Sequence, residues 1–195
     1  GRQASPLFHS EYYLNNNGDL KAAFGTNKVS AINHFAQYGY NEPNRKVAKT
    51  ENLGDNFEAN ITSVSGSTVG LSGSNVVSSS SSKVWVFKLN SDGTYTITNK
   101  ANGKVHDVYA SSKASGAEIQ TYASNGTNAQ KWYIFKYSNG QYILRSKCAP
   151  LCVMTISGSN IVSGHGAGIA VNTGMNTEIG KIAEILSSEE SPQTP

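Results

Sequence analysis

The chain has 195 residues, the length of one domain of ordinary size with room for a small appendage. Only 15% of the residues are charged, and serine, asparagine, glycine and threonine fill their place, as is typical of a turn-rich β protein. The formal net charge is +3 and the basic residues form no cluster, which argues against a nucleic-acid interface and an acidic substrate. No apolar run approaches the length of a membrane span, and no signal peptide is visible.

Residues 7–46 carry the pattern of short helices. We predict three of them, each with its capping residue: 10–14 with Ser10, 19–24 with Asp19 and 31–38 with Ser30. In the third, Ile32, Phe35 and Ala36 are spaced i, i+3 and i+4, which predicts one apolar face. We therefore expect a small helical module over residues 1–46.

The rest of the chain has the pattern of β structure. Short apolar alternations are separated by Ser-Gly, Asp-Gly and Asn-Gly turns, which predicts strands throughout. We place a polar linker at 47–52, the β region at 53–186 and a disordered tail at 187–195. The β region is long enough for three units of similar size.

A Trp-to-Tyr pattern occurs twice in the β region, 47 residues apart. Trp85 stands ten residues before Tyr95, Trp132 stands ten residues before Tyr142, and both pairs enclose a glycine-containing turn. An internal repeat of this period indicates one supersecondary unit that is stacked or arranged radially. We expect both tryptophans to fill the core and hold the fold, since each is a large apolar group at the start of a strand.

The middle repeat carries three motifs in a fixed order: Asp107-Val108, Ile119-Gln120-Thr121-Tyr122 and Gln130-Lys131-Trp132. In this order and spacing they resemble the ricin-B-type β-trefoil lectin family, whose signature is one Q-x-W motif per repeat. The resemblance implies a mainly β fold, a β-trefoil preceded by the small α-helical module. It divides the β region into repeats at about 53–90, 91–136 and 137–186.

Six residues of the middle repeat match the sugar site of that family: Asp107, Gln120, Tyr122, Asn125, Asn128 and Gln130. The implied ligand is a glycan of the galactose or N-acetylgalactosamine type. A carboxylate accepts charge-assisted hydrogen bonds from two sugar hydroxyls, an amide both donates and accepts, and an aromatic ring packs on the sugar face. Gln130 is also expected to tie a loop to backbone groups. The family often has an asparagine at the position of Ala129, so this chain departs from the pattern at one hydroxyl contact.

The first and third repeats lack this set of residues. The pair Lys83-Val84 precedes Trp85 where the Q-x pair is due, and the equivalent strand has no Asp-Val. In the third repeat, Met154 stands where Asp107 stands in the second, and Ile182 stands where a third tryptophan is due. We expect no sugar site in either repeat.

The N-terminal part carries a second resemblance. Its segments resemble the short helical tandem repeat of bacterial secreted and cell-surface proteins, on residues 8–14, 18–20 and 34–39. Residues 1–6 resemble the joint between successive copies of that repeat, and they contain no methionine. The resemblance implies an extracellular or cell-surface location. It also implies that the chain is a piece of a longer protein, linked in cis to other domains.

The C-terminal part carries a third resemblance. Residues 157–166 and 173–183 resemble the end of a P-type cation-ATPase actuator domain. The motifs that carry ATPase chemistry are absent from the sequence, so no transport activity is expected. The segment 154–195 is either a degenerate third repeat or a foreign splice, and the sequence leaves both interpretations open.

The two cysteines, Cys148 and Cys152, flank a turn at Pro150. They predict either a local disulfide or two free thiols, and they are too few for a zinc site. No set of residues in a recognisable motif predicts a catalytic centre, and we expect no metal and no cofactor. Two functions remain: a non-catalytic carbohydrate-binding module, or a structural or protein-interaction trefoil that has lost its sugar site.

Overall fold

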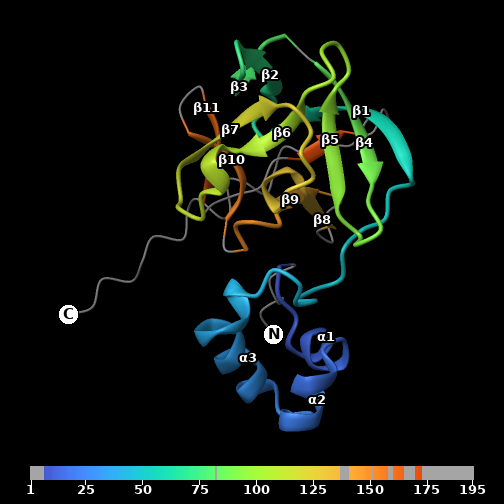
Figure 1. The fold of residues 1–195 in the computed structure, drawn as a ribbon, viewed down its shortest axis with the longest axis vertical. Coiled ribbons are helices and arrows are strands. Elements are labelled where there is room, and N and C mark those ends of the chain that lie inside the picture. Colours follow the sequence, from blue (N-terminus) through green and yellow to red (C-terminus); the bar gives the residue numbers. More distant parts are fainter. Residues whose placement is uncertain are drawn as a thin grey trace, which may run out of the picture.

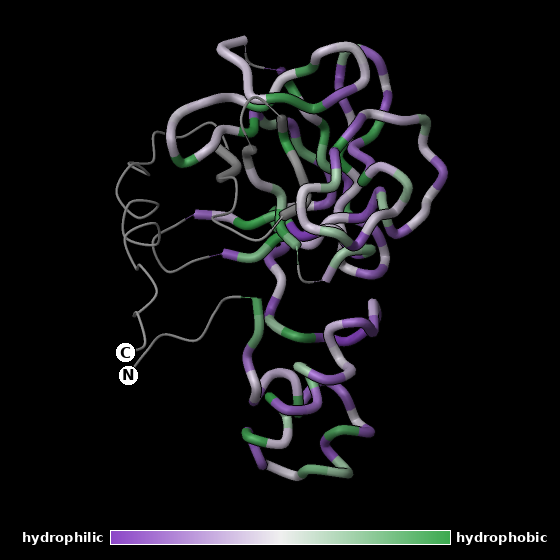
Figure 2. Tube along the Cα trace, turned by 90° about the vertical axis from the view of Figure 1, so that its left-hand side faces the viewer, coloured by the Kyte–Doolittle hydropathy of each residue, from purple (hydrophilic) through white to green (hydrophobic). Residues whose placement is uncertain are grey.

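The computed structural model describes residues 7–81, 83–136, 141–150, 152–157, 160–164 and 170–172. A small helical unit lies at one end of a larger β domain, and two perpendicular views agree on this arrangement (Figures 1 and 2). Four predictions concern residues that the structure does not describe: the joint at 1–6, Ile182, the segment 173–183 and the tail at 187–195. Within the described part, no helix is both long and apolar enough to cross a membrane.

The helical unit contains α1 (Ser10–Asn15), α2 (Gly18–Phe24), α3 (Lys28–Gln37) and the short 3-10 helix η1 (Gly39–Asn41). The three predicted caps are wrong, because each helix begins earlier, after His9, Asn17 and Asn27.

Two of these earlier residues satisfy the free backbone amides of the first turn. The Asn27 Oδ1 atom accepts hydrogen bonds from the backbone amides of Val29 and Ser30, both at 3.1 Å. The His9 Nδ1 atom accepts one from the amide of Tyr12 at 3.2 Å. An asparagine and a histidine therefore cap helices for which serines were predicted.

The core of the helical unit is formed by Tyr13, Leu14, Leu20, Ala31 and Val47. The predicted apolar face of α3 is wrong by one position, since Ile32 is 50% exposed and Ala36 is also exposed. The face that points inward carries Ala31, His34 and Phe35 instead.

A close contact explains this orientation of α3. The Tyr13 hydroxyl lies 2.9 Å from His34 Nδ1, and a Cβ atom on Gly39 would lie only 1.9 Å from that hydroxyl. The buried tyrosine therefore requires glycine at position 39 and a polar partner on the inner face of α3.

The β domain has the following strands: β1 (Asn56–Thr62), β2 (Thr68–Ser72), β3 (Asn75–Ser79), β4 (Val84–Leu89), β5 (Tyr95–Asn99), β6 (Val105–Val108), β7 (Ala117–Tyr122), β8 (Trp132–Lys136), β9 (Tyr142–Ser146), β10 (Val153–Ser157), β11 (Asn160–Gly164) and β12 (Ala170–Asn172). Two more 3-10 helices, η2 (Tyr109–Ser111) and η3 (Asn128–Gln130), follow β6 and β7.

Antiparallel pairing closes these strands into a barrel with a cap. The barrel runs β12–β1–β4–β5–β8–β9, and β9 lies beside β12. The hairpins β2–β3, β6–β7 and β10–β11 form the cap, in which β3, β7 and β11 pair with one another. This arrangement of the described strands confirms the predicted β-trefoil.

The two tryptophans occupy equivalent positions in the first and second repeats. Both Trp85 and Trp132 are fully buried. The indole nitrogen of Trp85 donates to the backbone oxygen of Val69, and that of Trp132 donates to the backbone oxygen of His106, both at 3.4 Å. Val69 and His106 therefore occupy equivalent positions in the first and second repeats, and so do the residues that follow them, Gly70 and Asp107.

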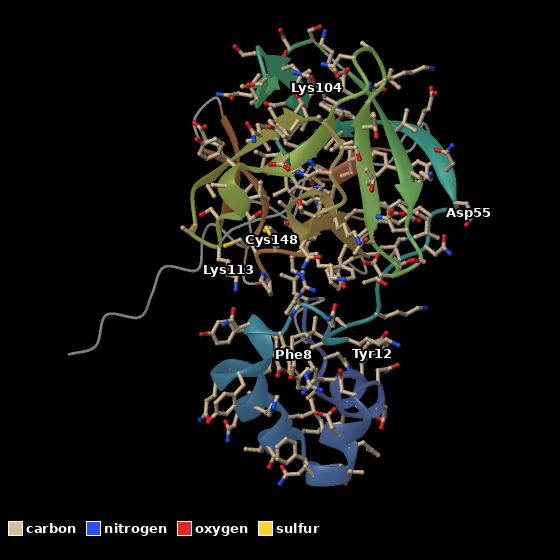
Figure 3. The ribbon with its side chains drawn as sticks, viewed as in Figure 1. Phe8, Tyr12, Asp55, Lys104, Lys113 and Cys148 are labelled. Atoms are coloured by element: carbon tan, nitrogen blue, oxygen red, sulfur yellow. The ribbon has the colours of Figure 1, made fainter. Side chains whose placement is uncertain are left out.

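The segment between the two units is packed against both. Val47 and Ala48, at the start of the expected polar linker, are only 5% and 6% exposed. Ala48 joins a cluster with Phe135, Ile143 and Val153, and the amide of Glu51 donates to the oxygen of Ile134 at 2.8 Å. A second contact joins Lys113 Nζ to Asn41 Oδ1 at 2.7 Å, and Lys113 lies on the side of the β domain that faces the helices (Figure 3).

Candidate saccharide site in the second repeat

Asp107 lies near the end of β6, directly opposite Gln120 of β7. Its carboxylate is held by two side-chain amides. Oδ1 accepts a hydrogen bond from Gln120 Nε2 at 3.2 Å, and Oδ2 accepts one from Gln130 Nε2 at 2.9 Å. The side chain is only 6% exposed, so these two bonds fix its orientation before any ligand arrives.

Gln130 connects this carboxylate to the loop that follows β7. Its Oε1 accepts from the backbone amides of Asn125 at 2.7 Å and Gly126 at 3.3 Å, and its Nε2 also donates to the oxygen of Ala123 at 2.9 Å. The amide is 1% exposed, and all of its donors and acceptors are used within the protein. Gln130 therefore ties the loop to β6, and the structure leaves it no polar atom for the sugar contact that was expected of it.

Tyr122 and Gln120 belong to the same face of β7 as the Asp107 carboxylate. Residues two apart on a strand point to one side of the sheet, and Asp107 is the cross-strand neighbour of Gln120. Tyr122 is the diagonal neighbour of Asp107, a relation that spans about 7–8 Å between Cα atoms. The ring is 53% exposed, so an accessible aromatic surface stands beside a fixed carboxylate.

The two asparagines of the predicted site lie at its edge. Asn125 is exposed, and its Oδ1 accepts from the amide and the hydroxyl of Thr127, at 3.0 and 2.8 Å. Asn128 is exposed at the start of η3, and its side chain makes no hydrogen bond to the described residues. Ala129 is 1% exposed, so the departure from the family pattern lies beneath the surface rather than on it.

Sequence reasoning missed the segment that follows Asp107. Tyr109 is 58% exposed, and η2 lies beside η3. Ala110 and Ser111 adopt φ values of +53° and +51°, a conformation that residues other than glycine rarely adopt. Strained pairs of this kind concentrate at ligand sites. The only local signal was an aromatic residue one position after the Asp-Val motif.

The other two repeats carry no carboxylate at the equivalent point. In the first repeat the position is Gly70, where a Cβ atom would lie 2.6 Å from the Cβ of Ser79. In the third repeat the strand registers place Thr155 of β10 at this point, so the predicted equivalence of Met154 is wrong by one residue, and the buried Met154 corresponds to His106. The second repeat is thus the one in which this point of the fold holds an ionisable side chain.

The residue before Asp107 is also unusual. His106 is fully buried, with its ring centroid 4.1 Å from that of Trp85, and both ring nitrogens lack a hydrogen-bond partner. Burial lowers the pKa of His106 to about 3, so the ring is neutral and does not neutralise the adjacent carboxylate.

The sequence left open whether the two cysteines form a disulfide, and in the structure they do not. Cys148 and Cys152 are both buried thiols. The Cys148 Sγ atom lies 3.2 Å from the Ser146 hydroxyl, and burial raises the pKa of the Cys148 thiol. In the part of the chain that the structure describes, no three of the histidine, cysteine, aspartate and glutamate side chains gather into a metal site.

Comparison with known proteins matches residues 81–171 to the family described as ricin-type beta-trefoil lectin domain-like. Three similar solved structures share the fold. The designed threefold-symmetric protein ThreeFoil has 21% identity and a TM-score of 0.52, over 60% of this chain and 98% of its own. A Polyporus squamosus lectin, bound to a human-type influenza-binding epitope, has 20% identity and a TM-score of 0.53, over 62% of this chain and 49% of its own.

The third structure is an exo-beta-1,3-galactanase from Clostridium thermocellum, with 18% identity and a TM-score of 0.51 over 65% of this chain and 32% of its own. This chain therefore spans only part of the natural proteins that it matches. The comparisons do not support the resemblances to the helical tandem repeat or to the ATPase segment.

Proposed function

We propose, because residues 81–171 match the family described as ricin-type beta-trefoil lectin domain-like, that the chain is a non-catalytic carbohydrate-binding module whose one sugar site lies in the second repeat. The finer proposal is a sugar of the galactose or N-acetylgalactosamine type, bound by Asp107, Gln120, Tyr122, Asn125 and Asn128. Gln130 positions two of these groups without touching the ligand. We further propose that the module is secreted, acts outside the cell or at its surface, and is linked in cis to other domains.

The observation that carries this proposal is the pairing of a fixed carboxylate with an accessible ring. Each Asp107 oxygen uses one lone pair on an amide, which leaves one lone pair on each oxygen for a sugar hydroxyl. Two adjacent hydroxyls on the edge of a sugar ring match that pair of acceptors. Tyr122, and Tyr109 on the other side of the strand end, offer apolar surface to the sugar face.

The expected affinity is low. The site is open at the surface and holds one sugar ring, so we expect a dissociation constant between about 1 mM and 0.1 mM, or roughly −4 to −6 kcal/mol. Retention on a glycan surface would then depend on the cis-linked domains, because a second binding event within one molecule occurs at high effective concentration.

A titration with galactose, lactose and N-acetylgalactosamine tests the proposal. We expect saturable shifts of the Tyr122 and Gln120 nuclear magnetic resonance signals, and loss of these shifts in Asp107→Asn, which keeps the shape of the side chain. Asp55→Asn is the matched control, since Asp55 is an exposed carboxylate that precedes β1 (Figure 3). A sugar response that survives Asp107→Asn would refute the assigned site.

A second candidate function is a structural or protein-interaction trefoil. Gly70 and Thr155 favour it, since two of the three repeats lack the carboxylate, and so does the buried Ala129. A broad glycan panel that shifts no signal of the chain would establish this second function in place of the first. Detectable glycan turnover by the purified chain would overturn the non-catalytic assignment.

A further inference from the structure

A second cavity lies between the helical unit and the β domain, away from the site of Asp107. Its volume is about 430 Å³, which is in the range of small-molecule sites. Residues from both units line it, and they combine aromatic rings with basic groups: Tyr12, Arg45 and Lys46 from the helical unit, and Tyr133, Phe135, Arg145 and Lys147 from the β domain. Tyr12 faces the β domain in Figure 3.

Arg145 of β9 is the group in this cavity that most needs a partner. The side chain is only 5% exposed, and its Nε atom is buried without a hydrogen bond. Among the described residues no carboxylate pairs with it. Its guanidinium carbon lies 5.2 Å from the ring centroid of Tyr133 and 4.9 Å from that of Phe135.

These ring contacts compensate the buried charge only in part. A cation–π contact contributes less free energy than the removal of a charge from water without a counterion costs. Burial lowers the pKa of Arg145 to about 10, so the group remains charged at neutral pH. The fold thus maintains a positive charge whose buried Nε donor has no acceptor among the described residues.

The other charges around the cavity are mostly balanced. Lys147 and Lys131 share Asp92, at 3.0 and 3.3 Å. Arg45 is paired with Asp19 and with Glu42.

Lys46 adds a further positive charge at the mouth of the cavity. It is exposed and forms no ion pair with the described residues. When the ion pairs within the protein are not counted, the positive charges of Arg145 and Lys46 remain at the cavity.

We propose that this cavity binds a saccharide that carries a carboxylate, such as a uronic acid. The planar fork of an arginine matches a carboxylate in two parallel hydrogen bonds, which would supply the missing acceptors of Arg145. Lys46 would add a second, longer-range attraction. The rings of Tyr12 and Tyr133 would cover the apolar face of the sugar ring. None of these residues belongs to the Asp107 site, so an experiment can support one of the two sites and refute the other.

The test compares glucuronate with glucose on the whole 195-residue chain. The two sugars differ in the carboxylate alone, so glucose measures everything except the proposed ion pair. We expect glucuronate to shift the Tyr133 and Tyr12 signals saturably, glucose to leave them unchanged, and added salt to weaken the response. Inorganic phosphate at matched ionic strength serves as a third probe. Equal responses to glucuronate and glucose, or a response to phosphate with none to glucuronate, would overturn the proposal.

Variants locate the site. We expect Arg145→Met to weaken glucuronate binding at least tenfold, Arg145→Lys to weaken it less, and Lys46→Gln to weaken it about threefold. Lys104→Gln is the matched control, since Lys104 is an exposed lysine on the far side of the β domain (Figure 3), and it should bind as the wild type does. Wild-type affinity in Arg145→Met would also refute the proposal.

Two further measurements separate the possible failures. If Arg145→Met does not fold, two other results test whether glucuronate binds in the cavity: the effect of Lys46→Gln, and the residues whose signals shift in the wild type. Shifts confined to residues outside the cavity would contradict the proposal. Galactose binding should be the same in Arg145→Met and in the wild type. Its absence from both would end the proposed lectin function without touching the glucuronate result.

Discussion

The second and third repeats of the β-trefoil place different side chains at one point of the fold. The strand registers make Asp107 of β6 equivalent to Thr155 of β10, and His106 equivalent to the buried Met154. Asp107 is held by two amides beside an exposed ring, whereas Thr155 offers no carboxylate. One backbone position can therefore hold a charged or a neutral side chain without a change in the fold.

The largest effect is expected from a charge placed in the core, one residue before the point equivalent to Asp107. Met154 is fully buried in the hydrophobic core, so Met154→Asp would bury an unpaired charge and should lower the free energy of unfolding by about 3–5 kcal/mol. Urea denaturation measures this, with Met154→Leu as the control, which should cost less than about 1.5 kcal/mol. A Met154→Asp protein as stable as the wild type would contradict this prediction.

The next effect concerns the amide that supports Asp107. Gln130→Ala would remove four hydrogen bonds and leave the buried carboxylate with one amide, so we expect a loss of about 3 kcal/mol in stability together with the loss of sugar binding. Gln120→Ala is the matched control, because it removes a single hydrogen bond from a half-buried residue, and it should cost about 1 kcal/mol. Equal losses in the two variants would contradict the supporting role of Gln130.

A third effect separates His106 from Met154, its counterpart in the third repeat. The pKa of His106 is lowered to about 3, so between that value and the ordinary 6.5 the unfolded chain binds a proton that the folded chain does not. The contribution of the neutral His106 ring to the free energy of unfolding is therefore complete above pH 6.5. It is lost as the pH falls, by at most about 1.4 kcal/mol per pH unit. His106→Leu should flatten this decline between pH 6.5 and 4.5.

Thermal or urea denaturation at several pH values provides this measurement. His9→Leu is unsuitable as a control because His9 caps α1, so Val153→Leu, which changes a buried residue without a titrating group, takes that place. An unchanged pH dependence in His106→Leu would mean that other groups cause the acid instability.

The smallest effect is expected at the exposed ring. Tyr122→Ala should weaken galactose binding about fivefold, or roughly 1 kcal/mol, and leave the stability within about 0.5 kcal/mol of the wild type, because the side chain is 53% exposed. Tyr109→Ala measures in the same way whether the aromatic residue after the Asp-Val motif contributes. A large loss of stability in Tyr122→Ala would indicate a structural role for the ring.

The β-trefoil and the composition of the second repeat were accessible from the sequence. The repeat of Trp85 and Trp132, the Asp107-Val108 pair and the Q-x-W motif are local patterns, and the alternation of strands carries them to one rim without further information. The missing carboxylate of the third repeat was visible as well, although the structure moves the equivalent position by one residue, from Met154 to Thr155.

Other features were wrong or invisible at that level. The helix caps were predicted wrongly because several residues that can cap a helix stand at neighbouring positions, and each helix begins one to three residues earlier than predicted. Gln130 looked like a ligand-contacting amide, and only the loop that folds over it shows that all of its hydrogen bonds are used internally.

The sequence by itself determined the strands, their threefold recurrence and the single repeat with a carboxylate, since each depends on residues close together in the chain. The tertiary structure alone decided the cavity of Arg145, because its walls come from residues about a hundred positions apart. The basic residues that looked scattered along the chain converge there through the docking of the helical unit. Long-range packing determines which charges become neighbours, and no local pattern records it.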